Sequence, residues 1–173
     1  KDLAWVGYDA CSTASNHTLD SGVPGVRRTL AALDAAGLAH DGSARTSREA
    51  DRVRLLDAGP AQVALLSYTY GLNGFVRPAD RPWIVDLIDP DQIHDNAAQA
   101  RRAGADVVLV ALHWGNEYQR APSDVQRGLA ARLLASPDID LVYGHHAHVV
   151  QPFERIGDKW VAYGLGNHVA DPT

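Results

Sequence analysis

The stretch Asp140-Leu-Val-Tyr-Gly-His-His-Ala-His-Val-Val-Gln151 decides how this sequence is interpreted. It opens with the apolar run 141–143, which is typical of a buried strand. Gly144 breaks the run, and three histidines follow at once: His145, His146 and His148. Imidazole groups at the end of a strand are typical ligands of a divalent transition metal. The stretch therefore predicts a metal site beyond the end of a buried strand.

The path of the backbone after Gly144 decides which imidazoles meet. On an extended backbone, His146 and His148 point to the same side, and His145 points away from them as a supporting or structural residue. If the backbone turns sharply after Gly144, the opposite assignment becomes possible. Both arrangements stay open from the sequence, so all three histidines are candidate ligands.

A polar stretch near the start of the chain, Ser15-Asn-His-Thr-Leu-Asp20, is a second candidate. The amide oxygen of Asn16 is a possible metal ligand. His17 is better placed to donate a proton to a leaving group, or to bind a substrate anion, than to share the same metal. Asp20 lies three residues on and is a candidate to orient the His17 ring. The simpler alternative is that Asp20 caps the helix that follows.

The third candidate stretch is Ala111-Leu-His-Trp-Gly-Asn-Glu117, which follows the clearest strand-like run of the chain. His113 stands at the end of that run and is a candidate ligand. We expect Trp114 to pack beside the site. Glu117 either supports the ligands or faces substrate, and its simpler alternative is a solvated loop carboxylate.

Composition limits the class of protein. The chain has 173 residues, of which 46% are hydrophobic, and this fits a single domain over residues 1–173 with a real core. The net charge is −5 and no basic block stands out, so nucleic acid is not an expected partner. No apolar run approaches the roughly 18 residues that predict a membrane span. Methionine is absent, so we expect a fragment, truncated at its N-terminus and also at its C-terminus.

Strands and helices alternate through the middle of the chain. Apolar runs predict strands at residues 62–68, 83–88, 106–112, 140–143, 149–156 and 160–165, the last two joined as a hairpin. Apolar spacing and capping patterns predict helices at residues 24–36, 90–103 and 124–136, with 38–59 mostly irregular. This order predicts a layered α/β domain with helices flanking a mixed sheet. Sites in such folds gather beyond the carboxyl ends of the strands, where the histidines fall.

Four motifs in sequence resemble one family. They are Asn-His-x-x-Asp-x-Gly at 16–22, Leu-His-Trp-Gly-x-Glu at 112–117, Gly-His-His-x-His at 144–148 and Tyr-Gly-Leu-Gly-Asn at 163–167. Their order closely resembles the CapA (PGA_cap) family of poly-γ-glutamate capsule biosynthesis proteins. The resemblance implies a calcineurin-like metallophosphoesterase fold, here without its first strands. Ala147 and His168 depart from the usual proline and aromatic residue, and neither change removes an expected ligand.

The resemblance also implies a site. Divalent metal ions, two of them if the site is complete, would be Mn, Fe or Zn. The implied ligands are Asn16, His113, His145, His146 and His148; His17 and Asp20 would be catalytic; and Trp114, Glu117 and Asn167 would bind substrate or support the ligands. The family's opening Gly-Asp strand and its Asn-Leu-Glu segment are missing here, so we expect only part of a dinuclear site.

Two functions are compatible with these motifs. The first is a metal-dependent hydrolase of a phosphoester or of a polymer amide bond. The second is a non-catalytic accessory subunit that grips an anionic polymer within a capsule synthesis or export complex. The resemblance implies other capsule synthesis subunits as partners. It also implies a location outside the cell or at its surface, anchored in the membrane through a segment outside this chain.

Overall fold

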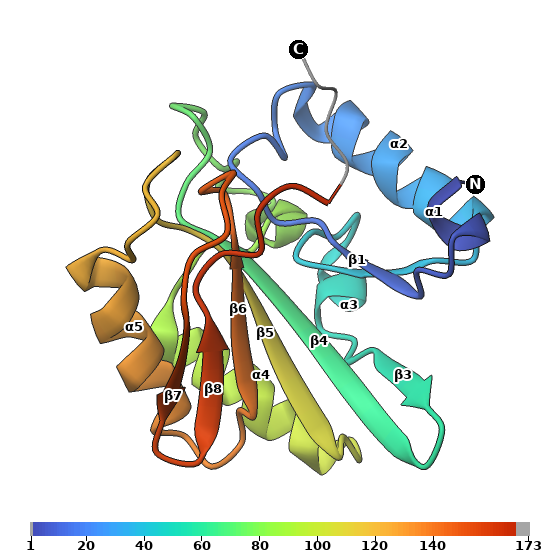
Figure 1. Ribbon diagram of the computed structural model, residues 1–173. Coiled ribbons are helices and arrows are strands. Elements are labelled where there is room, and N and C mark those ends of the chain that lie inside the picture. The colour runs from blue at the N-terminus through green and yellow to red at the C-terminus, as the bar shows by residue number, and fades with distance from the viewer. Residues whose placement is uncertain (1, 169–173) are drawn as a thin grey trace.

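The computed structural model describes residues 2–168 and centres on a six-stranded mixed sheet (Figure 1). Its strand order is β3-β4-β5-β6-β8-β7. The four central strands run parallel, whereas β3 and β7 lie antiparallel at the two edges. The strands are β3 (Leu55–Ala58), β4 (Ala61–Thr69), β5 (Val107–His113), β6 (Leu141–His145), β7 (Phe153–Ile156) and β8 (Lys159–Ala162).

Two helices, α4 (Pro90–Arg102) and α5 (Asp124–Leu134), cover one face of this sheet (Figure 1). Both begin as their sequences predict. Asp89 accepts hydrogen bonds from the first turn of α4, and Ser123 forms a reciprocal capping box with Gln126 at the start of α5. Between helices and sheet lies the main core, which includes Ile93, Ala97, Val108, Val110, Leu112, Leu133 and Val142.

A second, smaller layer packs beside β4. It contains α2 (Gly22–Ala35) and a two-stranded parallel sheet of β1 (Ala10–Ser12) and β2 (Ala39–Asp41). Val26 and Leu30 of α2 are buried in a second core with Leu19, Leu72 and Ile84. Two short helices, α1 (Asp2–Trp5) and α3 (Ser47–Ala50), complete the layer. No helix in the described part of the chain is long and apolar enough to cross a membrane.

The predicted fold class is confirmed, because a mixed sheet is flanked by helices as expected. The predicted strand at 83–88 is wrong. A 3-10 helix occupies Pro82–Ile84, and this segment pairs with β4 only through a single bridge between Thr69 and Leu87. The apolar run had another cause, since Ile84 and Val85 are buried in the second core.

Two further boundaries differ from expectation. Residues 38–59 were expected to be irregular, but they contain β2, α3 and β3. These elements are only three or four residues long, too short for an apolar period to mark them. The last hairpin is also shorter than predicted. Strand β7 starts at Phe153 rather than 149, directly after Pro152, which has no backbone N–H to give to a strand partner.

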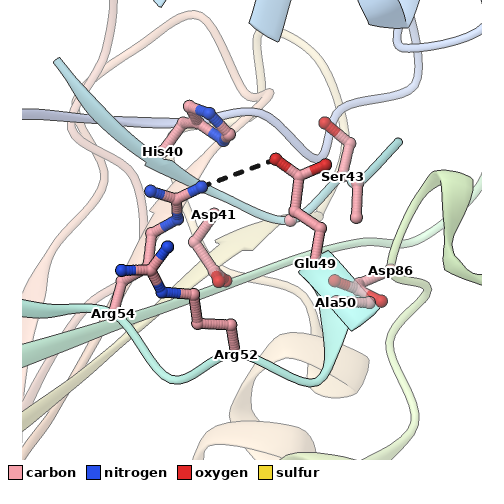
Figure 2. A pocket seen from close by; sticks show the side chains of 10 residues that line it. His40, Asp41, Ser43, Glu49, Ala50, Arg52, Arg54 and Asp86 are labelled. Atoms are coloured by element: carbon pink, nitrogen blue, oxygen red, sulfur yellow. Dashed lines mark ion pairs between the residues drawn. The ribbon is translucent and has the colours of Figure 1, made fainter. Parts of the chain in front are cut away.

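Asp41 and Asp86 are two of the three carboxylates, with Glu49, that line a pocket of about 20 Å³ where the small layer meets β4 (Figure 2). Asp41 accepts a hydrogen bond from the backbone N–H of Ser67 at 2.8 Å, and the Asp86 backbone N–H donates to Gly42 O at 2.9 Å. Burial, with a smaller contribution from Asp86, raises the pKa of Asp41 to about 7. Burial likewise raises the pKa of Asp86 to about 6.

Asp41→Asn is expected to flatten the dependence of stability on pH. An unfolded aspartate ionises near pH 4, so the unfolded chain releases a proton that folded Asp41 keeps up to about pH 7. Wild-type stability therefore falls as the pH rises between these values. Asp41 borders a pocket, so solvent reduces the effect. We expect the free energy of unfolding of the variant to exceed that of the wild type by only on the order of 1–2 kcal/mol at pH 8, and the difference to vanish near pH 4.

Urea unfolding at pH 4.5 and pH 8 measures this difference. Asp95→Asn, on an exposed position of α4, is the matched control and should give the same small change at both pH values. If Asp41→Asn raised the free energy of unfolding equally at both pH values, the raised pKa of Asp41 would not be the cause.

Candidate functional site

The register of the parallel strands assembles the site. Thr69, His113 and His145 are direct partners across β4, β5 and β6, so these three strands end side by side. The carboxyl ends of parallel strands share one edge of a sheet, and the loops that follow them meet there. Segments 15–20 and 146–148, which carry other candidate residues, lie at this edge too, together with the loop 70–74.

Asn16, His113 and His146 form the centre of the site. The Oδ1 atom of Asn16 lies 2.8 Å from His113 Nε2, and Asn16 is only 3% exposed. The His113 and His146 rings lie 4.8 Å apart between centroids. Tyr70, which the sequence analysis did not single out, stacks parallel to His113 and contacts His146 with a centroid distance of 4.8 Å.

The backbone turns sharply after β6, so the extended arrangement of the histidine cluster is wrong. His146 and His148 adopt left-handed backbone conformations, with φ of 91° and 57°. The imidazoles of this cluster line one pocket of about 550 Å³ together with His113. His145 lies at the end of β6, where its ring contacts the edge of Tyr143. His145 both lines the pocket and packs against Tyr143, so its two roles, as a ligand or as a supporting residue, both stay open.

Two predicted supporting residues lie close to the cluster. Asn167 Oδ1 is 2.8 Å from His148 Nδ1, a contact that fixes the ring through one nitrogen and leaves Nε2 for another partner. Glu117 is exposed on its loop, and its charge acts on His146 to oppose the fall of its pKa.

His17 and Asp20 form a hydrogen-bonded pair. The His17 Nδ1 and Asp20 Oδ2 atoms are 2.7 Å apart, and the His17 side chain is 64% exposed. Asp20 does not cap α2, because the N-cap position is Ser21 and no side chain caps it. The carboxylate therefore orients an accessible imidazole, which suits a group that delivers a proton to a substrate.

Gly144 is where β6 allows a close approach. A Cβ atom at this position would lie 2.0 Å from Tyr163 O and 2.2 Å from Trp114 Nε1. Trp114 is 3% exposed, and its Nε1 donates to Tyr163 O at 2.9 Å. Trp114 thus packs beneath the site, and the missing side chain at Gly144 lets the histidine turn sit directly above it.

A chain of buried amides holds the loops around the site. Gln126 Nε2 donates to Gln151 Oε1 at 2.9 Å, and Gln151 Nε2 donates to Gln119 O at 2.7 Å. Both glutamine side chains are 2% exposed or less. They connect the start of α5, the loop after β5 and the exit of the histidine cluster. The capping pattern at 123–126 predicts the local role of Gln126 but not this contact, because Gln151 lies 25 residues further along the chain.

The electrostatics of the centre suit neutral imidazoles. Burial, followed by the neighbouring histidines, lowers the pKa of His113 to about 3. Burial also lowers the pKa of His146, and its Nδ1 atom is buried without a hydrogen-bond partner. Neutral imidazole is the form that binds metals. The donor set of Asn16, His113 and His146 therefore fits a divalent transition metal, which prefers nitrogen and oxygen ligands of this kind.

The fit is partial. Within residues 2–168, no three His, Cys, Asp or Glu side chains are arranged to hold a metal ion. The centre has two imidazoles and one amide, and the His146 and His148 rings are 6.4 Å apart between centroids. On their own, these residues would supply only part of a coordination shell.

Comparison with known proteins agrees with the motifs. The model of the family described as "Bacterial capsule synthesis protein PGA_cap" matches residues 1–172. The chain belongs to the PGA_cap family. It is 31% identical to the PGA biosynthesis protein CapA of Bacillus subtilis over 99% of this chain and 45% of that protein. It is 29% identical to the capsule biosynthesis protein CapA of Bacillus anthracis, over 99% of this chain and 42% of the relative.

A "Probable polyglutamine synthesis accessory protein" of Mycobacterium tuberculosis is 34% identical over 93% of this PGA_cap chain and 45% of its own length. The chain thus spans less than half the length of the curated relatives it matches. Among solved structures, a Staphylococcus aureus protein described as a 5′-nucleotidase gives a TM-score of 0.65 at 21% identity, covering 95% of this chain and 34% of that one. The Thermus thermophilus sulfate thiohydrolase SoxB gives a TM-score of 0.61 at 20% identity, covering 95% of this chain and 29% of that one. The fold is that of the metallophosphoesterases.

Gly144→Ala is expected to destabilise the protein and displace the histidine turn. The added methyl group meets the backbone carbonyl of Tyr163, which belongs to the adjoining segment and has little room to move. We expect a loss of about 3 kcal/mol or more in the free energy of unfolding. Chemical denaturation of the purified variant measures it.

Gly128→Ala in α5 is the matched control. A Cβ at Gly128 meets no atom within 4 Å, and alanine favours a helix, so a gain of about 0.5–1 kcal/mol is expected. Equal effects of the two substitutions would contradict a close approach at Gly144.

Proposed function

We propose that this chain carries part of the active site of a metal-dependent hydrolase that acts in capsule or poly-γ-glutamate biosynthesis. The observation that carries the proposal is the meeting of Asn16, His113 and His146 beside the His17–Asp20 pair. A binding site alone has little need for an accessible imidazole that a carboxylate orients. The substrate class is a phosphoester or an amide bond of the polymer.

The residues would divide the work as follows. Asn16, His113, His146 and His148 would hold divalent metal, with Mn, Fe and Zn as the candidates, and His145 is a further candidate ligand. Metal in such a site activates water and neutralises charge on the reacting group. Asp20 holds His17 through Nδ1, so the proton for the leaving group would come from Nε2. The remaining ligands would come from parts of the protein outside these 173 residues.

The same chain supports a second function. The relative in Mycobacterium tuberculosis is named as an accessory protein, and a metal-lined groove is also able to grip an anionic polymer without cleaving it. In either case we place the protein at the cell surface, anchored through a segment outside this chain, with other capsule synthesis subunits as partners.

The test is metal content and turnover in the full-length protein, for wild type and for His146→Ala/His148→Ala. We expect stoichiometric transition metal in the wild type and loss of both metal and hydrolysis in the double variant. Substrates are a chromogenic phosphodiester and poly-γ-glutamate, the latter followed by size-exclusion chromatography. Metal without turnover of either substrate would favour the accessory subunit. A folded wild type that binds no metal would overturn both versions.

His17→Ala is expected to slow hydrolysis in a way that depends on the leaving group. An alkyl phosphodiester needs a proton on its leaving oxygen, so kcat should fall by about 10²–10⁴. A nitrophenyl diester leaves as a stable anion, so its kcat should change far less.

Comparing kcat for the two esters therefore isolates the acid role. Metal content should stay at the wild-type level, because His17 is exposed and pairs with Asp20 rather than with the central imidazoles. An equal loss with both esters would show that His17 is not the acid.

A further inference from the structure

Asn73 stands in the loop after β4 in a conformation that few side chains tolerate. Its φ is +50°, and Gly74 follows with φ of +82°. Asparagine accepts this left-handed region more readily than most residues. The preceding Leu72 is 6% exposed and packs in the second core with Leu19, so the loop is anchored at this point. The Asn73 side chain is thereby brought to the central site.

The Asn73 side chain contacts two site residues. Its Oδ1 accepts a hydrogen bond from Asn16 Nδ2 at 3.0 Å, and its Nδ2 lies 3.4 Å from His17 Nδ1. Asn16 is buried, and its own Oδ1 faces His113 Nε2 at 2.8 Å. The two ends of the Asn16 amide are therefore used differently: the nitrogen is held by Asn73, and the oxygen faces the imidazoles.

This difference has a physical consequence. The two ends of an asparagine amide have nearly the same size, so packing alone does not choose between the two orientations. Only an acceptor beside one end and a donor beside the other make the choice. A flipped Asn16 would aim its NH₂ group at the imidazoles, and an NH₂ group is no metal ligand.

We propose that Asn73 is a positioning residue that holds the Asn16 amide with Oδ1 facing His113 and the metal position. The metal-affinity tests of this proposal rest on the proposed function, because they assume that the site binds metal. The orientation of the Asn16 amide does not, because it is a property of the protein without metal. Residues that orient metal ligands typically alter metal affinity by about 10–100-fold when they are removed.

The first experiment measures Mn²⁺ affinity of the full-length protein by calorimetry for Asn73→Gly and Asn73→Asp. Glycine removes the side chain and keeps the backbone conformation, so we expect Mn²⁺ binding to weaken about 10–100-fold. Aspartate keeps an acceptor for Asn16 Nδ2, so its affinity should stay at or above the wild-type value. Affinity of Asn73→Gly within twofold of wild type would overturn the proposal.

A double-mutant cycle with Asn16→Asp separates orientation from loop damage. The two oxygens of a carboxylate are equivalent, so a residue at 16 with no preferred end needs no partner to orient it. Adding Asn73→Gly to Asn16→Asp should therefore leave Mn²⁺ affinity unchanged or raise it. If Asn73→Gly weakened Mn²⁺ binding as much in the Asn16→Asp variant as it does in the wild type, Asn73 would only support the loop. That result would overturn the proposal.

A metal-free readout keeps the proposal distinct from the proposed function. In the wild type, the Asn16 side-chain NH₂ protons should give nuclear Overhauser contacts to residue 73 and none to the His113 ring. In Asn73→Gly, contacts between these protons and the His113 ring should appear. If the wild type binds no Mn²⁺, the metal role fails, while the Overhauser contacts still decide how the Asn16 amide is oriented. Wild-type contacts from the NH₂ protons to the His113 ring would overturn the proposed orientation.

Discussion

The parallel pairing of β4, β5 and β6 is the constraint on which the site depends. Because Thr69, His113 and His145 are aligned across three strands, the loops after them must leave the sheet at one edge. A slip of one residue in β5 would turn His113 to the opposite face and bury it among the helices. The apolar side chains packed between sheet and helices fix this register, so the main core positions the chemistry.

Much of this arrangement was readable from the sequence, for a physical reason. Buried parallel strands are unbroken apolar runs, so 106–112 and 140–143 predicted β5 and β6 with ends one or two residues from those in the structure. The polar residues that follow them then had to meet. The segment 83–88 misled for the same reason, since burial against α2 produces an apolar run without a strand.

What the sequence could not supply was the conformation of turns and the partners across loops. The positive φ values of His146 and His148 arise where β6 ends against Trp114 and Tyr163, a contact made by residues far apart in the chain. Asn73 carried no signal, because one asparagine in a loop rich in glycine and proline is ordinary turn chemistry. Its role depends on Asn16, 57 residues earlier.

The polar groups of the site are arranged by distance from the core. Asn16 is 3% exposed and the ring of half-buried His113 lies against it, where burial lowers the pKa of the imidazole and makes an unsatisfied amide costly. His17 is far more accessible, with its side chain 64% exposed, and takes its orientation from Asp20 instead of from packing. A group that binds metal needs a fixed position and no charge, whereas a group that passes a proton to substrate needs access to it. Under the proposed function, buried Asn16 and exposed His17 would meet these two requirements from adjacent positions of one loop.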